Sequence, residues 1–211
     1  MAMGETYEEF IAKFDKNKAK TTDDCYTPRA VYETVQQYVE DMYGIPKSKM
    51  IRPFYPGGDY ENEIYPEGCC VVDNPPFSIL QKIINFYYDH NIKFFMFAPG
   101  LTLADFGRFR TSQIFVKSTA GAIVYDNGAK VQTSFVTNLD ERPAIWRDDY
   151  LTEELEKCQN IKSRKKNVVP PDAIYAAGIK TKGGFYYLDQ LEKHPDNKHI
   201  FGQSYILKTP H

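Results

Sequence analysis

Apolar residues along the chain follow two spacings, one typical of amphipathic helices and the other of buried strands. A spacing of three and four gives residues 28–43 and 78–87 one apolar face each, which predicts two helices. Continuous apolar runs of strand length occupy residues 69–72 and 92–98, as in parallel strands covered on both faces. The order strand, turn, helix and strand predicts a βαβ unit with a right-handed crossover.

The ends of the two helices carry recognisable start and stop signals. Thr27 precedes Pro28, and Ser78 precedes the second helix, so we expect Thr27 and Ser78 to be the N-cap residues. Gly44 and Pro46 should end the first helix.

Further elements are expected on both sides of this unit. Asp126, Asn127 and Gly128 form a tight-turn signal between two strand-like runs, so residues 122–137 predict a β-hairpin. The remaining expected elements are an N-terminal helix, two strands and a short helix, at residues 5–19, 50–54, 114–116 and 151–158.

Length and composition favour one soluble α/β domain. A chain of 211 residues suits one ordinary core, and 42% hydrophobic with 26% charged residues is normal for a globular protein. We divide it into an N-terminal helix and linker (1–20), an α/β core (21–145) and a C-terminal extension packed on the core (146–211). The 16 Tyr and 14 Phe favour an aromatic-rich core over stacking surfaces.

The charge distribution limits the expected partners. A formal net charge of −2 argues against a protein that binds nucleic acid mainly through phosphates. Lys162, Arg164, Lys165 and Lys166 nevertheless form a basic run, which is either a solvated loop or a phosphate contact. No apolar run approaches a membrane-spanning length, and the charged N-terminus lacks the apolar region of a signal peptide. We therefore expect no membrane partner.

The cysteines and histidines do not predict a metal site. The four cysteines contain no C-x-x-C pair, and the four histidines have no zinc-ligand spacing. We expect no bound metal, and a reducing cytoplasm fits the cysteine usage best.

The stretch from Val71 to Phe77 marks a candidate active site. Pro75 and Pro76 lack N–H donors, so the strand cannot continue and the chain must leave it at Asn74 in a stiff turn. Phe77 is then held just beyond the carboxyl end of the strand, where open α/β sheets bind ligands. The alternative interpretation is a rigid loop without chemistry.

This turn suits chemistry on the exocyclic amine of a nucleobase. Such an amine is a poor nucleophile because its lone pair is delocalised into the ring. Two acceptors aimed at its hydrogens favour a pyramidal nitrogen, and the side-chain oxygen of Asn74 and the carbonyl of Pro75 could supply both. The ring of Phe77 could stack on a base swung out of a duplex. The reaction then needs a positioned electrophile rather than a metal or a covalent nucleophile.

A second candidate lies in the loop after the strand at 50–54. Gly57, Gly58 and Asp59 suit a close approach of the backbone to a ligand, with the carboxylate accepting from hydroxyls or an amine. An ordinary turn has the same composition, so both interpretations stay open.

The motifs resemble a known enzyme family. Asn74-Pro75-Pro76-Phe77 matches the (Asn/Asp/Ser)-Pro-Pro-(Tyr/Phe) motif of amino-methyltransferases that use S-adenosylmethionine. The segment 24–28 resembles the Asp-Glu-x-Tyr-Thr-Pro start of phage and bacterial DNA adenine-N6 methyltransferases. Residues 134–142 and the tail rich in glycine and aromatic residues resemble EcoRI-type adenine methyltransferases, and the resemblance covers roughly residues 22–205.

The resemblance implies an α/β fold with an abbreviated, Rossmann-like methyltransferase sheet, helices on both faces and a β-hairpin at one edge. It implies S-adenosylmethionine as cofactor and DNA as partner, with a homodimer left open. The catalytic residues would be Asn74, Pro75, Pro76 and Phe77. The residues that it places around the cofactor are Tyr26, Thr27, Pro28, Pro53, Phe54, Gly57, Asp59 and Asp73.

Two features depart from the family. Its first strand carries an acidic residue before a Pro-Phe pair, where this chain has Arg52. Only thirteen residues separate Asp59 from Asp73, whereas the family places two further strands and their helices there and a βαβ unit alone needs about 30 residues. The sequence therefore predicts that much of the cofactor half of the sheet is missing.

Three functions follow as hypotheses. The first is a compact DNA adenine-N6 methyltransferase. The second is a non-catalytic descendant that binds nucleic acid or acts as a decoy, which Arg52 and the short interval favour. The third is methylation of another planar amine or amide, such as a glutamine side chain, and the similarity of 26–28 and 134–142 to DNA enzymes argues against it.

Overall fold

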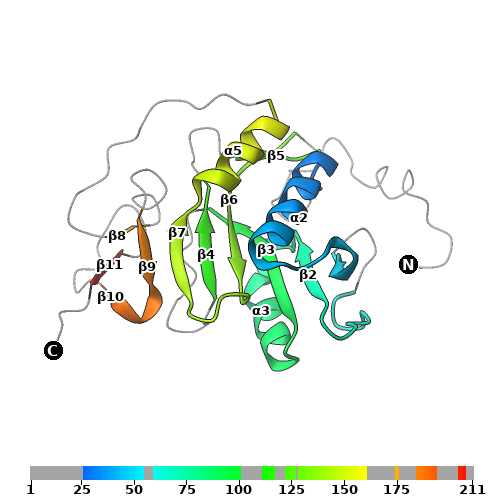
Figure 1. The fold of residues 1–211 in the computed structure, drawn as a ribbon, viewed down its shortest axis with the longest axis horizontal. Helices are drawn as coiled ribbons and strands as arrows, with labels where there is room; N and C mark the ends of the chain where they lie inside the picture. The colour runs from blue at the N-terminus through cyan, green and yellow to red at the C-terminus, as the bar shows by residue number, and fades with distance from the viewer. Residues whose placement is uncertain are drawn as a thin grey trace.

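The computed structural model describes residues 26–54, 59–100, 111–116, 122–126, 128–160, 174–175, 184–193 and 204–207. These residues form an α/β structure around a mixed, eight-stranded sheet (Figure 1). The strands of this sheet are β1 (Met50–Ile51), β2 (Cys70–Asp73), β3 (Lys93–Pro99), β4 (Ser112–Phe115), β5 (Ala122–Val124), β6 (Lys130–Thr137), β7 (Ala144–Arg147) and β9 (Phe185–Tyr187). A second, three-stranded sheet contains β8 (Ile174–Tyr175), β10 (Leu191–Lys193) and β11 (Ser204–Leu207).

The strands of the central sheet follow the order β1-β2-β3-β6-β4-β7-β9, and β5 pairs with β6 outside this path. β1, β2 and β3 are parallel to one another. β6 is antiparallel to β3, β4 and β5, and β9 is antiparallel to β7. Six strands therefore point in one direction and only β6 and β9 oppose them. This arrangement is compatible with a Rossmann-like sheet.

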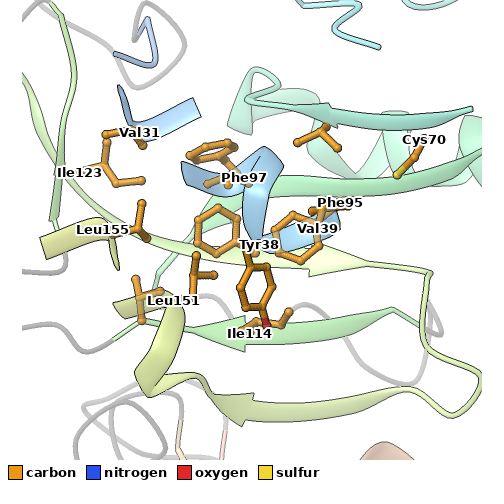
Figure 2. Packing of buried hydrophobic residues seen from close by; sticks show 14 of the residues in the cluster. Val31, Tyr38, Val39, Cys70, Phe95, Phe97, Ile114, Ile123, Leu151 and Leu155 are labelled. Atoms are coloured by element: carbon orange, nitrogen blue, oxygen red, sulfur yellow. The ribbon is translucent and has the colours of Figure 1, made fainter. Parts of the chain in front are cut away.

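In the described part of the chain, three α-helices cover the two faces of the sheet. The helices are α2 (Arg29–Tyr43), α3 (Leu80–Asp89) and α5 (Asp149–Cys158). Successive residues of a strand point to opposite faces, so each strand contributes to two cores. Phe95 and Phe97 lie in the core beneath α2 and α5, as Figure 2 shows, whereas Phe94 and Met96 lie in the core beneath α3. The predicted helices on both faces are therefore confirmed.

Both predicted helix caps are wrong. α2 begins at Arg29 after Pro28, without a side-chain hydrogen bond at its cap. Ser78 lies inside a 3₁₀ turn, Phe77–Ile79, that begins directly after Pro76. Because this 3₁₀ turn contains the three residues after Pro76, α3 begins only at Leu80. The end of α2 is as predicted, because Gly44 adopts the left-handed conformation with φ 67°.

The predicted hairpin forms, but it is not at an edge of the sheet. β5 and β6 pair in antiparallel fashion across the turn that contains Asp126 and Gly128. β6 is eight residues long and β5 only three, so the remainder of β6 pairs with β3 on one side and β4 on the other. The edges of the path are β1 and β9 instead. The edge position of the hairpin is therefore corrected.

The sheet also continues past the core boundary drawn at residue 145. β7 spans that boundary, and β9 from the C-terminal segment adds to β7 as a further strand. The expected helix at 151–158 is confirmed as α5, whereas the one at 5–19 lies outside the described residues. No helix in the described part of the chain is long and apolar enough to cross a membrane.

β1 pairs directly with β2, and residues 59–69 of the connection between them contain neither helix nor strand. Two tyrosines of this short connection pack into the core on the α3 side of the sheet. Tyr60 is 8% exposed, and its ring centroid lies 5.3 Å from that of Phe86 on α3. The Tyr65 hydroxyl donates to the Tyr60 carbonyl at 2.7 Å, and its ring packs against Tyr87. Tyr60 and Tyr65 therefore pack this connection onto α3.

Candidate functional site

The Asn74-Pro75-Pro76-Phe77 turn lies at the carboxyl edge of the parallel half of the sheet. β1, β2 and β3 are parallel, so the chain leaves all three strands at the same edge. Pro75 is buried, and Asn74 is half-buried. Phe77 is also half-buried and packs against the core beneath α2. The structure thus places this turn where the sequence predicted it, at a strand end where α/β sheets bind ligands.

Asp73, the last residue of β2, connects this turn to the segment after β1. Its side chain is almost completely buried, and its carboxylate accepts three hydrogen bonds from protein donors. Oδ2 accepts from the backbone N–H of Phe54 at 2.6 Å. Oδ1 accepts from the backbone N–H of Asn74 at 2.8 Å and from Nε of Arg52 at 3.1 Å. Phe54 and Asn74, both predicted site residues, are therefore brought together by one carboxylate.

Burial raises the pKa of Asp73 to about 6. The positive charge of Arg52 and the hydrogen bonds from Asn74, Phe54 and Arg52 act in the opposite direction. The charged form is disfavoured because desolvation in the interior outweighs these stabilising partners. Asp73 is therefore a buried acid whose charge changes near pH 6.

Arg52 connects this carboxylate to helix α2. Its guanidinium carbon lies 4.1 Å from the ring centroid of Tyr32, in a cation–π geometry. Burial raises the pKa of Asp126, and Arg52 counteracts that rise, so Arg52 also faces this second acid. The sequence showed Arg52 only as a departure from a family pattern. An acidic residue at the end of a buried apolar strand needs a cationic partner, and the position of Asp73 after Val71 and Val72 could therefore have predicted its pairing with Arg52.

The start of α2 contains a buried hydroxyl beside the helix N-terminus. The Tyr26 carbonyl accepts from the backbone N–H of Asp126 at 3.1 Å, which holds residue 26 beside the β5–β6 turn. The hydroxyl of Thr27 is buried and has no hydrogen-bond partner among the described residues. The helix that follows Pro28 has no side-chain cap and no acidic residue in its first turn. An uncapped helix N-terminus beside a buried hydroxyl suits a negatively charged or polar ligand group.

The glycine-rich loop is described only in part. Pro53 is buried, and the ring of half-buried Phe54 packs on Tyr60 with centroids 5.4 Å apart. Asp59 is exposed, and its carboxylate accepts from Nδ2 of Asn62 at 2.8 Å and from the backbone N–H of Glu61 at 3.0 Å. These bonds lower the pKa of Asp59 and are those of a turn stabilised by its own aspartate.

The described part of the chain leaves some predicted residues untested. Gly57 and the basic residues Lys162, Arg164, Lys165 and Lys166 lie outside the described residues. Within the residues described, no three His, Cys, Asp or Glu side chains come together as a metal ion would require.

Comparison of the chain with protein-family models, curated proteins and solved structures gives no match.

Proposed function

We propose that the protein is a DNA adenine-N6 methyltransferase that uses S-adenosylmethionine. The observation that carries this proposal is the Asn74-Pro75-Pro76-Phe77 turn at the carboxyl edge of β2, in the parallel half of the sheet. The resemblance of this turn to the methyltransferase motif supports the same reaction class. The position supports it because ligands of open α/β sheets bind at this edge.

Each residue of the turn has a role in this reaction. The side-chain oxygen of Asn74 and the carbonyl of Pro75 would accept the two hydrogens of the adenine amine and localise its lone pair. Pro75 and Pro76 limit rearrangement of the turn, because each fixes its own φ. Phe77 is anchored in the core beneath α2 and remains partly exposed, so that part of its ring is available to stack on an extruded base.

The start of α2 fits one end of the cofactor. S-adenosylmethionine, when bound, supplies an electrophilic methyl group and carries a carboxylate at its methionine end. The buried hydroxyl of Thr27 and the uncapped N-terminus of α2 would bind that carboxylate. Pro53 and Phe54, at the carboxyl end of β1, would border the cofactor from the other side. The turn conformation of Asp59 supports its role as a ribose acceptor less well.

A second candidate is a non-catalytic protein that binds nucleic acid and retains only the base site. Two observations favour it. Residues 59–69 contain no strand, where the family has two. The family's acidic position is occupied by Arg52, whose guanidinium faces the Asp73 carboxylate.

Calorimetric titration with S-adenosylmethionine, followed by a methyl-transfer assay on duplex and single-stranded DNA that contains adenine, separates the two candidates. The enzyme requires both donor binding and transfer. DNA binding without donor binding at millimolar concentration supports the second candidate and refutes the first.

Asn74→Ala tests the role of the turn directly. This variant should abolish methyl transfer and leave the affinity for the donor nearly unchanged, because Asn74 acts on the target amine. Asn85→Ala, on the exposed face of α3, is the matched control and should leave both unchanged. Transfer that survives in Asn74→Ala would refute the assigned role.

A further inference from the structure

We propose that Asp73 is a positioning residue, whose buried carboxylate fixes the segment after β1 and the turn after β2 in one arrangement. The consequence for catalysis rests on the proposed function, whereas the fixing of the two segments does not. In this arrangement Asp73 acts through Arg52, Phe54 and Asn74 and does not itself contact a ligand.

The two segments have no strand pairing where the site begins. The parallel register of β1 and β2 ends with Ile51 opposite Val71. Beyond this pair, the chain after β1 turns away through Pro53, while β2 continues to Asp73. The carboxylate crosses this gap by accepting from the backbone N–H of Phe54, and it also accepts from the N–H of Asn74. The Asp73 carboxylate therefore links the two segments beyond the last residue pair of the β1–β2 ladder.

The surroundings of Asp73 explain why it acts on protein groups. Its residue exposure is 1%, and its carboxylate already accepts from three protein donors. A ligand would have to displace these donors in a site where a buried charge without partners is costly. The Asp73 carboxylate therefore holds the backbone around the site in place by accepting hydrogen bonds from it.

Arg52 extends the same connection to the third part of the site. It bonds Asp73 and lies over the ring of Tyr32, which belongs to the first turns of α2. Tyr26, Thr27 and Pro28 directly precede this helix. One buried ion pair thus joins the elements that carry the proposed base site, the loop after β1 and the start of α2.

Protonation of Asp73 should loosen this connection. The groups that face it are Arg52 at the end of β1, Tyr32 on α2 and Tyr87 on α3, and Arg52 in turn faces Asp126. Arg52 is the cation among these groups. Below the raised pKa of Asp73, the carboxyl loses its charge and one of its acceptor positions, which weakens the bonds from Phe54, Asn74 and Arg52.

An NMR titration of the free protein tests the connection without reference to any reaction. In the wild type, the backbone amide resonances of Phe54 and Asn74 should shift together, with one common midpoint near pH 6. Asp73→Asn should abolish both shifts. Asp148→Asn, which changes another partly buried carboxylate that caps α5, should leave both unchanged. Separate midpoints, or a titration that persists in Asp73→Asn, would overturn the proposal.

A second variant keeps the test informative if Asp73→Asn does not fold. Arg52→Met retains the carboxyl and removes its cation, so the common midpoint of the two amides should move to higher pH. A midpoint that stays in place would show that the amides do not report on Asp73, and would overturn the proposal.

Methyl transfer then tests the positioning role itself. Asp73→Asn should lower kcat by about 100-fold, the effect expected when a reacting group is displaced by about 1 Å. We expect the activity of the wild type to fall below pH 6, and the pH profile of Asp73→Asn should lack this fall. Wild-type protein without any transfer activity would refute the proposed function but not the amide result. Wild-type activity in Asp73→Asn would refute the positioning role even if the proposed function holds.

Discussion

Removal of Arg52 should destabilise the protein, and the loss should depend strongly on pH. The proposed variant is Arg52→Met, which keeps much of the length of the side chain and removes the guanidinium. It deletes the bond from Nε to the carboxylate of Asp73 and the cation–π contact with Tyr32. The Asp73 carboxyl stays in place, buried and without its cation.

The magnitude at pH 8 follows from burial. Asp73 is ionised in the wild type at this pH, because its pKa is about 6. Breaking a buried ion pair by removal of one partner costs about 3 to 5 kcal/mol. The side chain of Arg52 is 22% exposed, so we expect the lower end of that range, about 3 kcal/mol.

At pH 5 the loss should be much smaller. Asp73 is then mostly protonated in the folded wild type, so the carboxyl carries little negative charge for Arg52 to neutralise. What remains is the contact with Tyr32, worth about 1 kcal/mol.

The direction of the effect follows from proton linkage. Asp73 has a pKa of about 6 in the folded protein, against an ordinary value of 3.8 for an aspartate. A carboxyl whose pKa is raised by folding contributes stability that is fully present below pH 3.8 and is lost as the pH rises through 6. For Asp73 in the wild type, this change amounts to about 3 kcal/mol. Without Arg52 the folded pKa lies higher still. The variant should therefore lose more stability than the wild type between pH 5 and pH 8.

Urea unfolding at the two pH values measures this difference. With an m-value of about 2 kcal/mol/M, the midpoint should fall by about 1.5 M at pH 8 and by about 0.5 M at pH 5. Arg29→Met is the matched control, because it breaks an exposed pair with Glu33 and should not move the midpoint at either pH. Equal losses at pH 5 and pH 8 in Arg52→Met would refute the assignment of Asp73 as the buried, titrating partner.

Two further substitutions test the fold. Gly44→Ala should lower the free energy of unfolding by about 1 kcal/mol in urea melts, because Gly44 has φ 67° and an added Cβ would meet no neighbour within 4 Å. A loss well above that value would mean that the end of α2 is packed more tightly than the structure shows. Tyr65→Phe should cost about 1 kcal/mol through loss of its bond to the Tyr60 carbonyl, and unchanged thermal melts would contradict the closing role of that bond.

The parts of the fold that could be predicted are those with a local cause. Strands buried on both faces must be continuously apolar, which located 69–72 and 92–98. The interior position of β6 has no such local cause. Its partners Phe95–Pro99 come from a strand more than 30 residues away, and the alternation within β6 does not reveal which neighbours it will have.

The candidate site divides in the same way. The proline pair locates the turn after β2 in the sequence, because prolines end a strand wherever the rest of the chain goes. The ion pair of Arg52 with Asp73 depends on the parallel register of β1 and β2, and the contact with Tyr32 depends on how α2 packs. Neither follows from spacing along the chain. The sequence thus predicts where the site is, and tertiary packing determines how it is held together.

The shortness of β1 limits how this protein can associate. A sheet edge with unpaired N–H and C=O groups is a template for another chain, and proteins protect such edges with short strands, lysines and proline. β1 has only two residues and follows the 3₁₀ turn Lys47–Lys49, and Pro53 comes one residue after Arg52 at its far end. It is therefore a poor template both for aggregation and for strand addition. A second chain that approached this edge would have to dock through side chains, because β1 offers too little backbone for a continuous sheet between two chains.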